Sequence, residues 1–126
     1  MERADVLVVD DDPDIRAMLG YALGGEFSVR FASSGLEAID ILASSPPDAM
    51  VLDVMMPGVD GYEVLEARRE RGLAPHTAVV MLTCKSAEQD LVRSWALGAD
   101  AFLSKPTDPA EIASRIRVHL ATSAPR

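Results

Sequence analysis

The sequence predicts an α/β domain in which a five-stranded parallel sheet lies between two layers of helices. Several short stretches are apolar throughout, which is typical of parallel strands that helices cover on both faces. Amphipathic stretches with helix start and stop signals separate these runs, so that five strands alternate with five helices, strand first. Right-handed crossovers between such strands produce three layers. The length of 126 residues suits a single domain.

The five expected strands are rich in β-branched and apolar residues and end abruptly at polar ones. Three of them contain no polar residue and end at Asp10, Asp53 and Thr83. Two weaker runs fit the remaining gaps, and the polar alternation of the earlier one suggests an edge strand. In chain order, the expected strands cover residues 6–9, 27–31, 49–52, 78–82 and 101–104.

Capping and breaking residues bound the five expected helices. Asp12 precedes Pro13 at the start of the first helix, and Asp60 with Glu63 forms a capping-box-like start for the third. The fourth is expected over 86–97 and the fifth begins at Asp108. The residues that end the first four helices are Gly24, Pro46, Gly72 and Gly98. The expected apolar stripes are Ile15, Met18, Leu19 and Ala22 in the first helix, Leu36, Ile39 and Leu42 in the second, and Ile112, Ile116 and Leu120 in the fifth.

Composition and charge exclude several classes of protein. Hydrophobic residues make up 48% and charged residues 25% of the chain, which indicates a packed globule. Twenty acidic against twelve basic residues give a net charge of −8, so direct nucleic-acid binding by this domain is not expected. The single cysteine, Cys84, rules out a disulfide within the chain and favours a reducing compartment. The start lacks a signal-peptide pattern, and no apolar run reaches the roughly 20 residues that span a bilayer. We therefore expect a cytoplasmic domain over 1–121 without membrane contact, followed by a tail or linker stub over 122–126.

Polar residues follow the expected strands at one edge of the sheet. In an open α/β sheet the ligand site lies beyond the carboxyl ends of the strands, where the strand order reverses. Asp10, Asp11 and Asp53 follow the first and third strands, and Thr83 and Lys105 follow the fourth and fifth. If the first and third strands are neighbours, as in the flavodoxin-like order 2-1-3-4-5, these five side chains converge.

Such a convergence favours phosphoryl transfer with a metal ion. Three carboxylates within about 4–6 Å repel one another, and a hard divalent cation such as Mg²⁺ or Mn²⁺ relieves the repulsion. Lys105 adds a positive charge and Thr83 a hydroxyl donor. Metal, cation, donor and an oxygen nucleophile are the parts that phosphoryl transfer needs. One carboxylate must stay free of bidentate metal binding in order to attack phosphorus and form an acyl phosphate.

Four segments of the chain resemble the receiver domain of two-component response regulators. They are the stretches Val-Val-Asp-Asp-Asp-Pro at 8–13, Leu-Asp-Val-Met-Met-Pro-Gly-Val-Asp-Gly at 52–61, Leu-Thr at 82–83, and Gly-Ala-Asp-Ala-Phe-Leu-Ser-Lys-Pro at 98–106. The resemblance covers essentially the whole chain, in order and with similar spacing. It implies a CheY-like phosphoacceptor switch rather than an enzyme, with at most self-phosphorylation from small donors and self-dephosphorylation.

The resemblance also implies roles for individual residues at the phosphorylation site. Asp53 would accept the phosphoryl group from a phosphohistidine. Asp11 would bind Mg²⁺ directly and Asp10 mainly through water, and the backbone carbonyl of Met55 would complete the protein ligands together with Asp53. Lys105 would pair with the phosphoryl group and with Asp53.

Further implied roles concern the switch and the partners. Thr83 would move to bond a phosphoryl oxygen, and the rotamer of Phe102 would follow it. The face of the fourth helix, fifth strand and fifth helix would then change and control an output. The Lys105–Pro106 peptide would be cis. The implied partners are a histidine kinase or phosphotransfer protein and a downstream effector domain or protein. A symmetric dimer through that face remains open, because Leu91 and Ala101 stand where the winged-helix subfamily usually has charged residues.

Two other functions remain as alternatives. A haloacid-dehalogenase-type phosphatase would use Asp10 as its nucleophile, since Asp10-x-Asp12 follows an apolar strand, but no strand-end acids follow Lys105. A pseudo-receiver would bind partners without phosphorylation, and the complete set of five site residues argues against it. Trp95 is either a packing residue or a partner contact.

Overall fold

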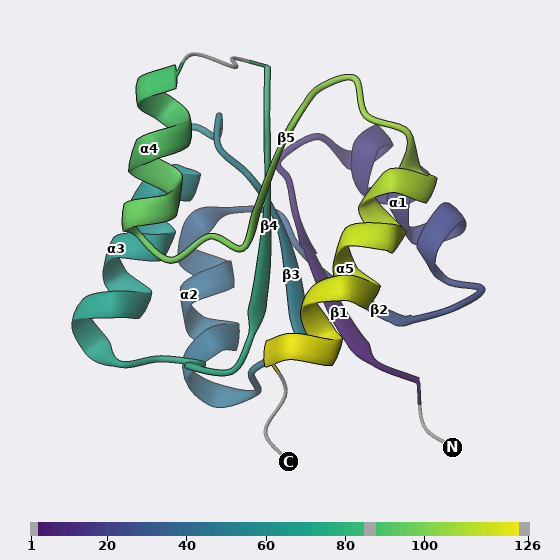
Figure 1. The fold of residues 1–126 in the computed structure, drawn as a ribbon, viewed down its shortest axis with the longest axis horizontal. Coiled ribbons are helices and arrows are strands. Elements are labelled where there is room, and N and C mark those ends of the chain that lie inside the picture. The colour runs from purple at the N-terminus through teal and green to yellow at the C-terminus, as the bar shows by residue number, and fades with distance from the viewer. Residues whose placement is uncertain (1–2, 85–87, 124–126) are drawn as a thin grey trace.

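A computed structural model describes residues 3–84 and 88–123 and contains a single parallel sheet of order β2-β1-β3-β4-β5 (Figure 1). Both the five strands and their predicted order are confirmed. The strands are β1 (Asp5–Val9), β2 (Ser28–Ala32), β3 (Ala49–Asp53), β4 (Ala78–Thr83) and β5 (Ala101–Ser104). β2 lies at an edge, as its alternating pattern predicts.

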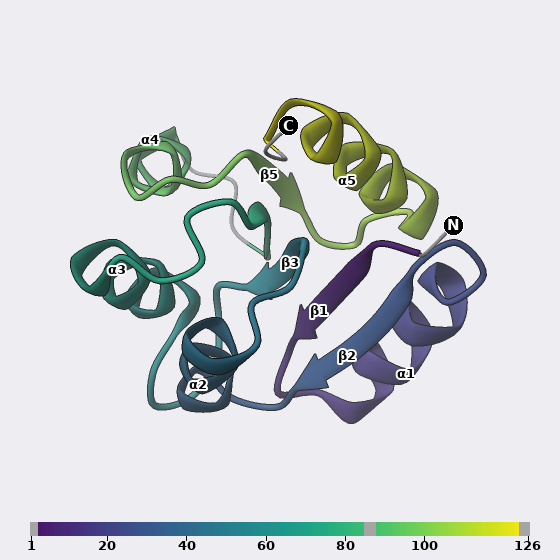
Figure 2. The ribbon, with the colours of Figure 1, turned by 90° about the horizontal axis from the view of Figure 1, so that it is seen from below.

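Helices cover both faces of this sheet. They are α1 (Pro13–Leu23), α2 (Gly35–Ser44), α3 (Gly61–Arg71), α4 (Glu88–Ala96) and α5 (Pro109–Ser123). Figure 2 shows α1 and α5 on one face and α2, α3 and α4 on the other. The expected start of α4 at residue 86 lies outside the described residues. Within 3–84 and 88–123, none of the helices has the length and apolar character needed to span a bilayer.

The last helix extends into the segment that the sequence predicts to be a tail. α5 continues to Ser123, past residue 121, where the sequence places the end of the domain. The cause is that neither glycine nor proline interrupts residues 110–123.

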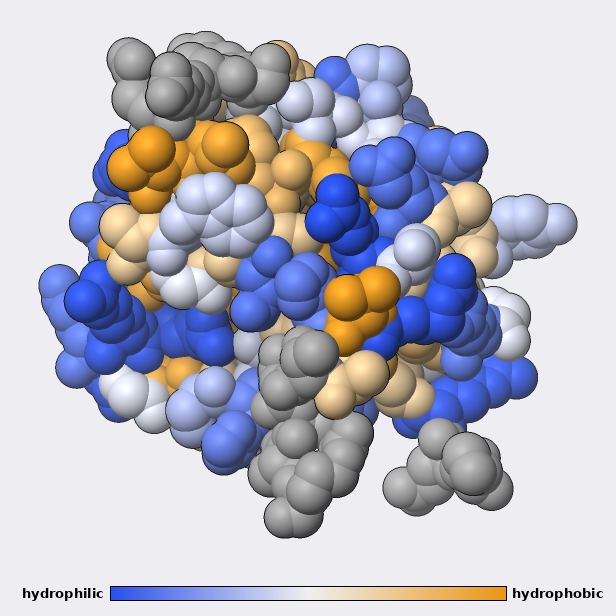
Figure 3. All heavy atoms as spheres, in the orientation of Figure 1, coloured by the Kyte–Doolittle hydropathy of each residue, from blue (hydrophilic) through white to orange (hydrophobic). Residues whose placement is uncertain are grey.

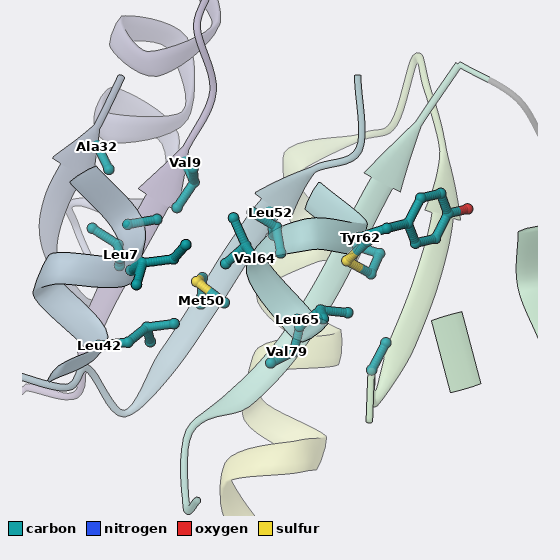
Figure 4. Close-up of a cluster of buried hydrophobic side chains, with 14 of the residues drawn as sticks. Leu7, Val9, Ala32, Leu42, Met50, Leu52, Tyr62, Val64, Leu65 and Val79 are labelled. Atoms are coloured by element: carbon teal, nitrogen blue, oxygen red, sulfur yellow. The ribbon is translucent and has the colours of Figure 1, made fainter. Parts of the chain in front are cut away.

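The core consists of two apolar clusters, one on each face of the sheet. Successive residues of a strand point to opposite faces, so that Leu7 and Val9 of β1 join one cluster, and Val6 and Val8 join the other. Figure 4 shows the first cluster, in which Leu7, Val9, Met50 and Leu52 of the sheet meet Leu42 of α2 and Val64 and Leu65 of α3. Burial on both faces explains why the central strands are apolar throughout.

Two of the expected helix stripes are narrower than the sequence suggested. Met18 and Leu36 are 47% and 64% exposed and Ala22 is exposed as well, so these three members of the expected stripes do not face the core. In α1, the residues that face the sheet lie four apart, at Ile15, Leu19 and Leu23, which turns Met18 towards solvent. Contact with a single face of the sheet buries a narrower stripe than the 3–4 spacing implies.

The predicted helix caps form. The Asp12 side chain accepts a hydrogen bond from the Asp14 N–H, and Asp60 and Glu63 form a complete capping box. α3 ends at Gly72, whose left-handed φ of 64° suits glycine. Asp12 is thus explained by capping, and the carboxylates available for chemistry are those beside it.

Candidate functional site

The strand register brings the predicted site residues to one edge of the sheet, uppermost in Figure 1. Val9 of β1 is opposite Leu52 of β3, which places Asp10 and Asp53 side by side at the strand ends. Thr83 of β4 is opposite Ser104 of β5, so Lys105 follows at the same edge. Asp10 and Asp53 can thus meet because β1 and β3 are adjacent strands, as the sequence predicts.

Three carboxylates form a compact group at this edge. Oxygen atoms of Asp10, Asp11 and Asp53 all lie within 4.8 Å of one another. Asp10 and Asp53 are buried, whereas Asp11 is exposed, so that the group is open to solvent on one side. Oxygen ligands with room for water fit Mg²⁺, which keeps several waters when it binds to proteins. The donor set therefore fits the metal that the sequence predicts.

Lys105 lies between the two buried carboxylates. Its Nζ is 3.2 Å from Asp10 Oδ2 and 3.2 Å from Asp53 Oδ1. Burial alone would lower the pKa of Lys105, but the two carboxylates outweigh burial and raise it. Lys105 is thus held as a cation against the oxygen atoms that would carry the chemistry.

The surroundings of Asp53 disfavour its charged form, in contrast to those of Lys105. Burial, followed by repulsion from Asp10, raises the pKa of Asp53 above its usual value. Lys105 and the Met55 backbone N–H, which is 3.3 Å from Asp53 Oδ1, offset only part of this effect. The site therefore holds a carboxylate that gains from an added positive charge.

Backbone contacts fix Asp10. Its N–H donates to the Ala32 carbonyl, and its Oδ1 accepts from the Asp12 N–H. Arg16 donates from Nη1 to the Asp10 carbonyl over 2.7 Å. The sequence did not indicate Arg16, because a separation of six residues matches no motif, and only the turn from β1 into α1 brings the two together.

Gly61 sets the position of α3 against Asp53. A Cβ atom at residue 61 would lie 2.6 Å from the Asp53 carbonyl oxygen and 2.9 Å from Val54 Cα. The Gly61 N–H also donates to the Val54 carbonyl. Gly61 lies in a segment that carries the resemblance, but only the structure shows that its missing side chain allows this close approach.

The remaining predicted residues surround this group. Thr83 is buried at the end of β4, and its carbonyl accepts a hydrogen bond from the Lys105 N–H over 2.7 Å. Phe102 is partly buried against the cluster that faces α2 and α3. Met55 is half exposed beside Asp53, and the Lys105–Pro106 peptide is cis, as the resemblance implies.

Burial and repulsion from Asp10 disfavour the charged form of Asp53, so removing this charge should stabilise the folded protein. In metal-free buffer near neutral pH, Asp53→Asn should raise the free energy of unfolding by about 1 kcal/mol, because burial and Asp10 disfavour the Asp53 carboxylate while Lys105 keeps Asp10 as a partner. Denaturant titrations of both proteins across pH would measure the difference.

The direction of the pH dependence follows from the raised pKa of Asp53. Its stabilising contribution is complete below the unfolded-state value of 3.8 and is lost as pH rises through the higher folded-state value. The advantage of Asp53→Asn should therefore be small in acid and grow with pH. A variant that is less stable than the parent at neutral pH would contradict this balance of charges.

Known proteins resemble the chain over nearly its whole length. The sequence model of the family described as response regulator receiver domain matches residues 6–117. The transcriptional regulatory protein YvrH of Bacillus subtilis is 39% identical over 122 residues, and the response regulator MprA of Mycobacterium tuberculosis is 40% identical over 121 residues. Both alignments cover 95% of this chain but only 50% and 52% of the relatives, so the chain spans about half their length.

A solved structure shows the same fold. The receiver domain of the Francisella response regulator 1452 superposes with a TM-score of 0.90 at 25% sequence identity, covering 97% of this chain and 100% of that one. The agreement in fold thus extends over nearly the whole chain.

Proposed function

The chain belongs to the response regulator receiver domain family of two-component systems, and on this premise we propose that Asp53 accepts a phosphoryl group from the phosphohistidine of a histidine kinase or phosphotransfer protein. Receiver domains of this family are phosphoacceptor switches rather than enzymes in the usual sense. The proposed receiver unit is residues 1–121, and its last helix runs on into the tail.

One observation carries this proposal, namely the placement of Asp53 Oδ1 3.2 Å from Lys105 Nζ beside the carboxylates of Asp10 and Asp11. An Asp53 oxygen attacks phosphorus, the new O–P bond forms, and the N–P bond of the donor breaks with its electron pair going to the imidazole. Lys105 stays within reach of the oxygens on which charge develops. The products are an acyl phosphate on Asp53 and a free histidine.

The residues present fit a divalent metal, and we assign Mg²⁺ or Mn²⁺ to them. Asp11 would bind it directly, Asp10 mainly through water, and Asp53 and the Met55 backbone carbonyl would complete the protein ligands. When bound, the metal supplies positive charge that offsets the carboxylates and the phosphoryl oxygens. Asp11 is exposed, and the donor's phosphoryl group would approach from this solvent side.

The switch would follow from the added charge. A phosphoryl group brings about −2 charge to Asp53 and three acceptor oxygens. Thr83, buried at the next strand end, would donate its hydroxyl to one of these oxygens, and Phe102 would turn inward with it. The surface of α4, β5 and α5 would then change and control an output. A phosphorylation-linked dimer through this surface is one form that the output could take.

A hollow next to the site suits the approach of a donor protein. It has a volume of about 390 Å³, lies between α1 and the start of α5, and is bordered by Ile15, Met18, Cys84, Lys105 and Pro106. Its walls are largely apolar, and Met18 is 47% exposed at its rim. We assign the docking of the histidine-bearing partner to this hollow, because Lys105, whose Nζ is 3.2 Å from Asp53 Oδ1, borders it.

This docking predicts a variant that separates protein donors from small ones. Met18→Glu should slow phosphoryl transfer from a phosphorylated kinase about tenfold, because it places a charge in an apolar contact that the partner must cover. Labelling by acetyl phosphate should stay within about twofold of the parent. The matched control is Leu36→Glu. Leu36 is also an exposed apolar residue, but it lies on α2 at the opposite face of the sheet. Equal slowing by both variants, or equal loss with acetyl phosphate, would rule out the assignment.

The test of the proposed function is to locate the acyl phosphate. The chain is incubated with acetyl phosphate and Mg²⁺, the acyl phosphate is reduced with borohydride to homoserine, and peptide mass analysis identifies the modified position. We expect Asp53. Modification of Asp10 would instead support the dehalogenase-type alternative, since Asp10 is equally close to Lys105. Complete absence of modification would favour a pseudo-receiver.

A further inference from the structure

A groove of about 360 Å³ lies between the C-terminal ends of α3 and α4. α3 begins against the Asp53 backbone and has 11 residues, so its far end is about 16 Å from the phosphoacceptor edge. The groove is therefore separate from the acidic group and from the hollow beside α1. No step of the phosphoryl transfer described above uses it.

The groove offers an apolar surface that is open to solvent. Leu73, Pro75 and Leu97 border it, and Trp95 of α4 lies beside them with 47% of its surface exposed. Figure 3 shows hydrophobic side chains gathered over α4 and strongly hydrophilic ones over the lower part of α3 next to it. Half-exposed tryptophan beside apolar residues is typical of surfaces that bind other proteins.

The charge of the groove is opposite to that of the chain. Arg68, Arg69 and Arg71 occupy the last turn of α3, whereas the whole chain has a net charge of −8. Two of these arginines border the groove, and no acidic residue is among the described residues that line it. Asp100 interacts with Arg68, so the exposed positive charge of the groove lies on Arg69.

The two bordering arginines differ in how far their donors are used. Arg68 donates to the carbonyls of Ala74 and Thr77 and is partly buried, so it acts mainly within the fold. Arg69 is exposed, and its Nη1 donates a hydrogen bond of 2.7 Å to the Ala96 carbonyl. A guanidinium has five N–H donors in a planar fork that matches a carboxylate. Arg69 is therefore placed to bind a further acidic group while it stays attached to α4.

We infer that this groove binds an acidic segment of a partner protein, with an apolar side chain of that segment seated beside Trp95 and a carboxylate on Arg69. The lining of the groove favours this occupant. An apolar side chain would pack against Trp95, Leu73 and Leu97, and a carboxylate would pair with the exposed Arg69. The unphosphorylated chain already presents this groove, so binding to it can be measured without phosphorylation of Asp53. The proposed peptide binding and the proposed phosphorylation of Asp53 are therefore tested by separate experiments.

The test uses the unphosphorylated chain and a synthetic peptide that contains glutamates and leucines but no tryptophan. Trp95 is the only tryptophan of the chain, so its fluorescence reports the groove. We expect a saturable fluorescence change, with backbone amide shifts confined to the ends of α3 and α4. A matched peptide with glutamine in place of glutamate should bind about fivefold more weakly, and added salt should weaken the glutamate peptide alone.

Two protein variants complete the experiment. Arg69→Gln should weaken the glutamate peptide about fivefold, whereas Arg117→Gln, an exposed arginine of α5 that pairs with Glu26, should leave its affinity unchanged. Equal binding of the two peptides, or amide shifts away from α3 and α4, would overturn the inference. A peptide that instead dissociates a self-association of the chain, seen by sedimentation, would assign the groove to a second copy. The peptide comparison uses the parent chain, so it decides even if Arg69→Gln folds poorly.

Discussion

Asp53→Asn should abolish the labelling of the chain by acetyl phosphate and by a phosphorylated histidine kinase. An amide in place of the carboxylate removes the anionic oxygen that attacks phosphorus, and no stable acyl phosphate can form on it. The exchange is close to isosteric, and Asp53 is buried between Lys105 and the Met55 N–H, so the surrounding fold should persist. Incorporation of phosphate, followed with labelled donors and by mass, should fall to the level of donor-free samples.

The matched control for this result is Asp12→Asn. It makes the same chemical change at an acid two residues from Asp10, yet Asp12 caps α1, and asparagine caps helices about as well. Its labelling should equal that of the parent. Undiminished labelling of Asp53→Asn would remove the acceptor assignment, and transfer of the label to Asp10 would revive the phosphatase alternative.

Asp11→Ala should weaken Mg²⁺ binding by about 100-fold, whereas Asp12→Ala should change it by less than about twofold. Oxygens of Asp11 lie within 4.8 Å of those of Asp10 and Asp53, and Asp11 is the exposed member that we assign as a direct ligand. Its loss leaves two buried carboxylates that Lys105 already neutralises in part, so little attraction for a dication remains.

Thermal unfolding measures this difference without any phosphoryl donor. A metal that binds only the folded chain stabilises it in proportion to the logarithm of its concentration. The midpoint of the parent and of Asp12→Ala should therefore rise as MgCl₂ is added, while that of Asp11→Ala should stay flat over the same range. Equal responses of the two alanine variants would contradict the assignment of Asp11, and a flat response of the parent would contradict the metal site as a whole.

Most of the fold could be predicted because its signals are local. The apolar runs that end at Asp10, Asp53 and Thr83 mark the central strands, and the caps at Asp12 and Asp60 mark two helix starts. Parallel strands place their carboxyl ends at one edge, so the grouping of the acids follows once the strand order is known. The order 2-1-3-4-5 comes from flavodoxin-like folds and agrees with the receiver-domain resemblance, since local signals in the sequence do not show which strands are neighbours.

The features that could not be predicted depend on distances across the fold. Met18 and Leu36 are apolar, but the way each helix is rotated against the sheet decides which of its apolar residues are covered. Arg16 meets the Asp10 carbonyl through a turn, and Gly61 meets the Asp53 carbonyl through the docking of a helix. The groove beside Trp95 is formed by two separate segments of the chain, so no single stretch of sequence predicts it.

The close contact of Gly61 with the Asp53 backbone gives α3 a mechanical role. A helix is stiff along its axis, and this one touches the acceptor strand at its first residue and carries three arginines in its last turn. A side chain at position 61 would push the start of α3 away from the Asp53 backbone, and the arginines at the end of the helix would shift with it. Glycine at position 61 thus lets α3 begin in direct contact with the acceptor strand.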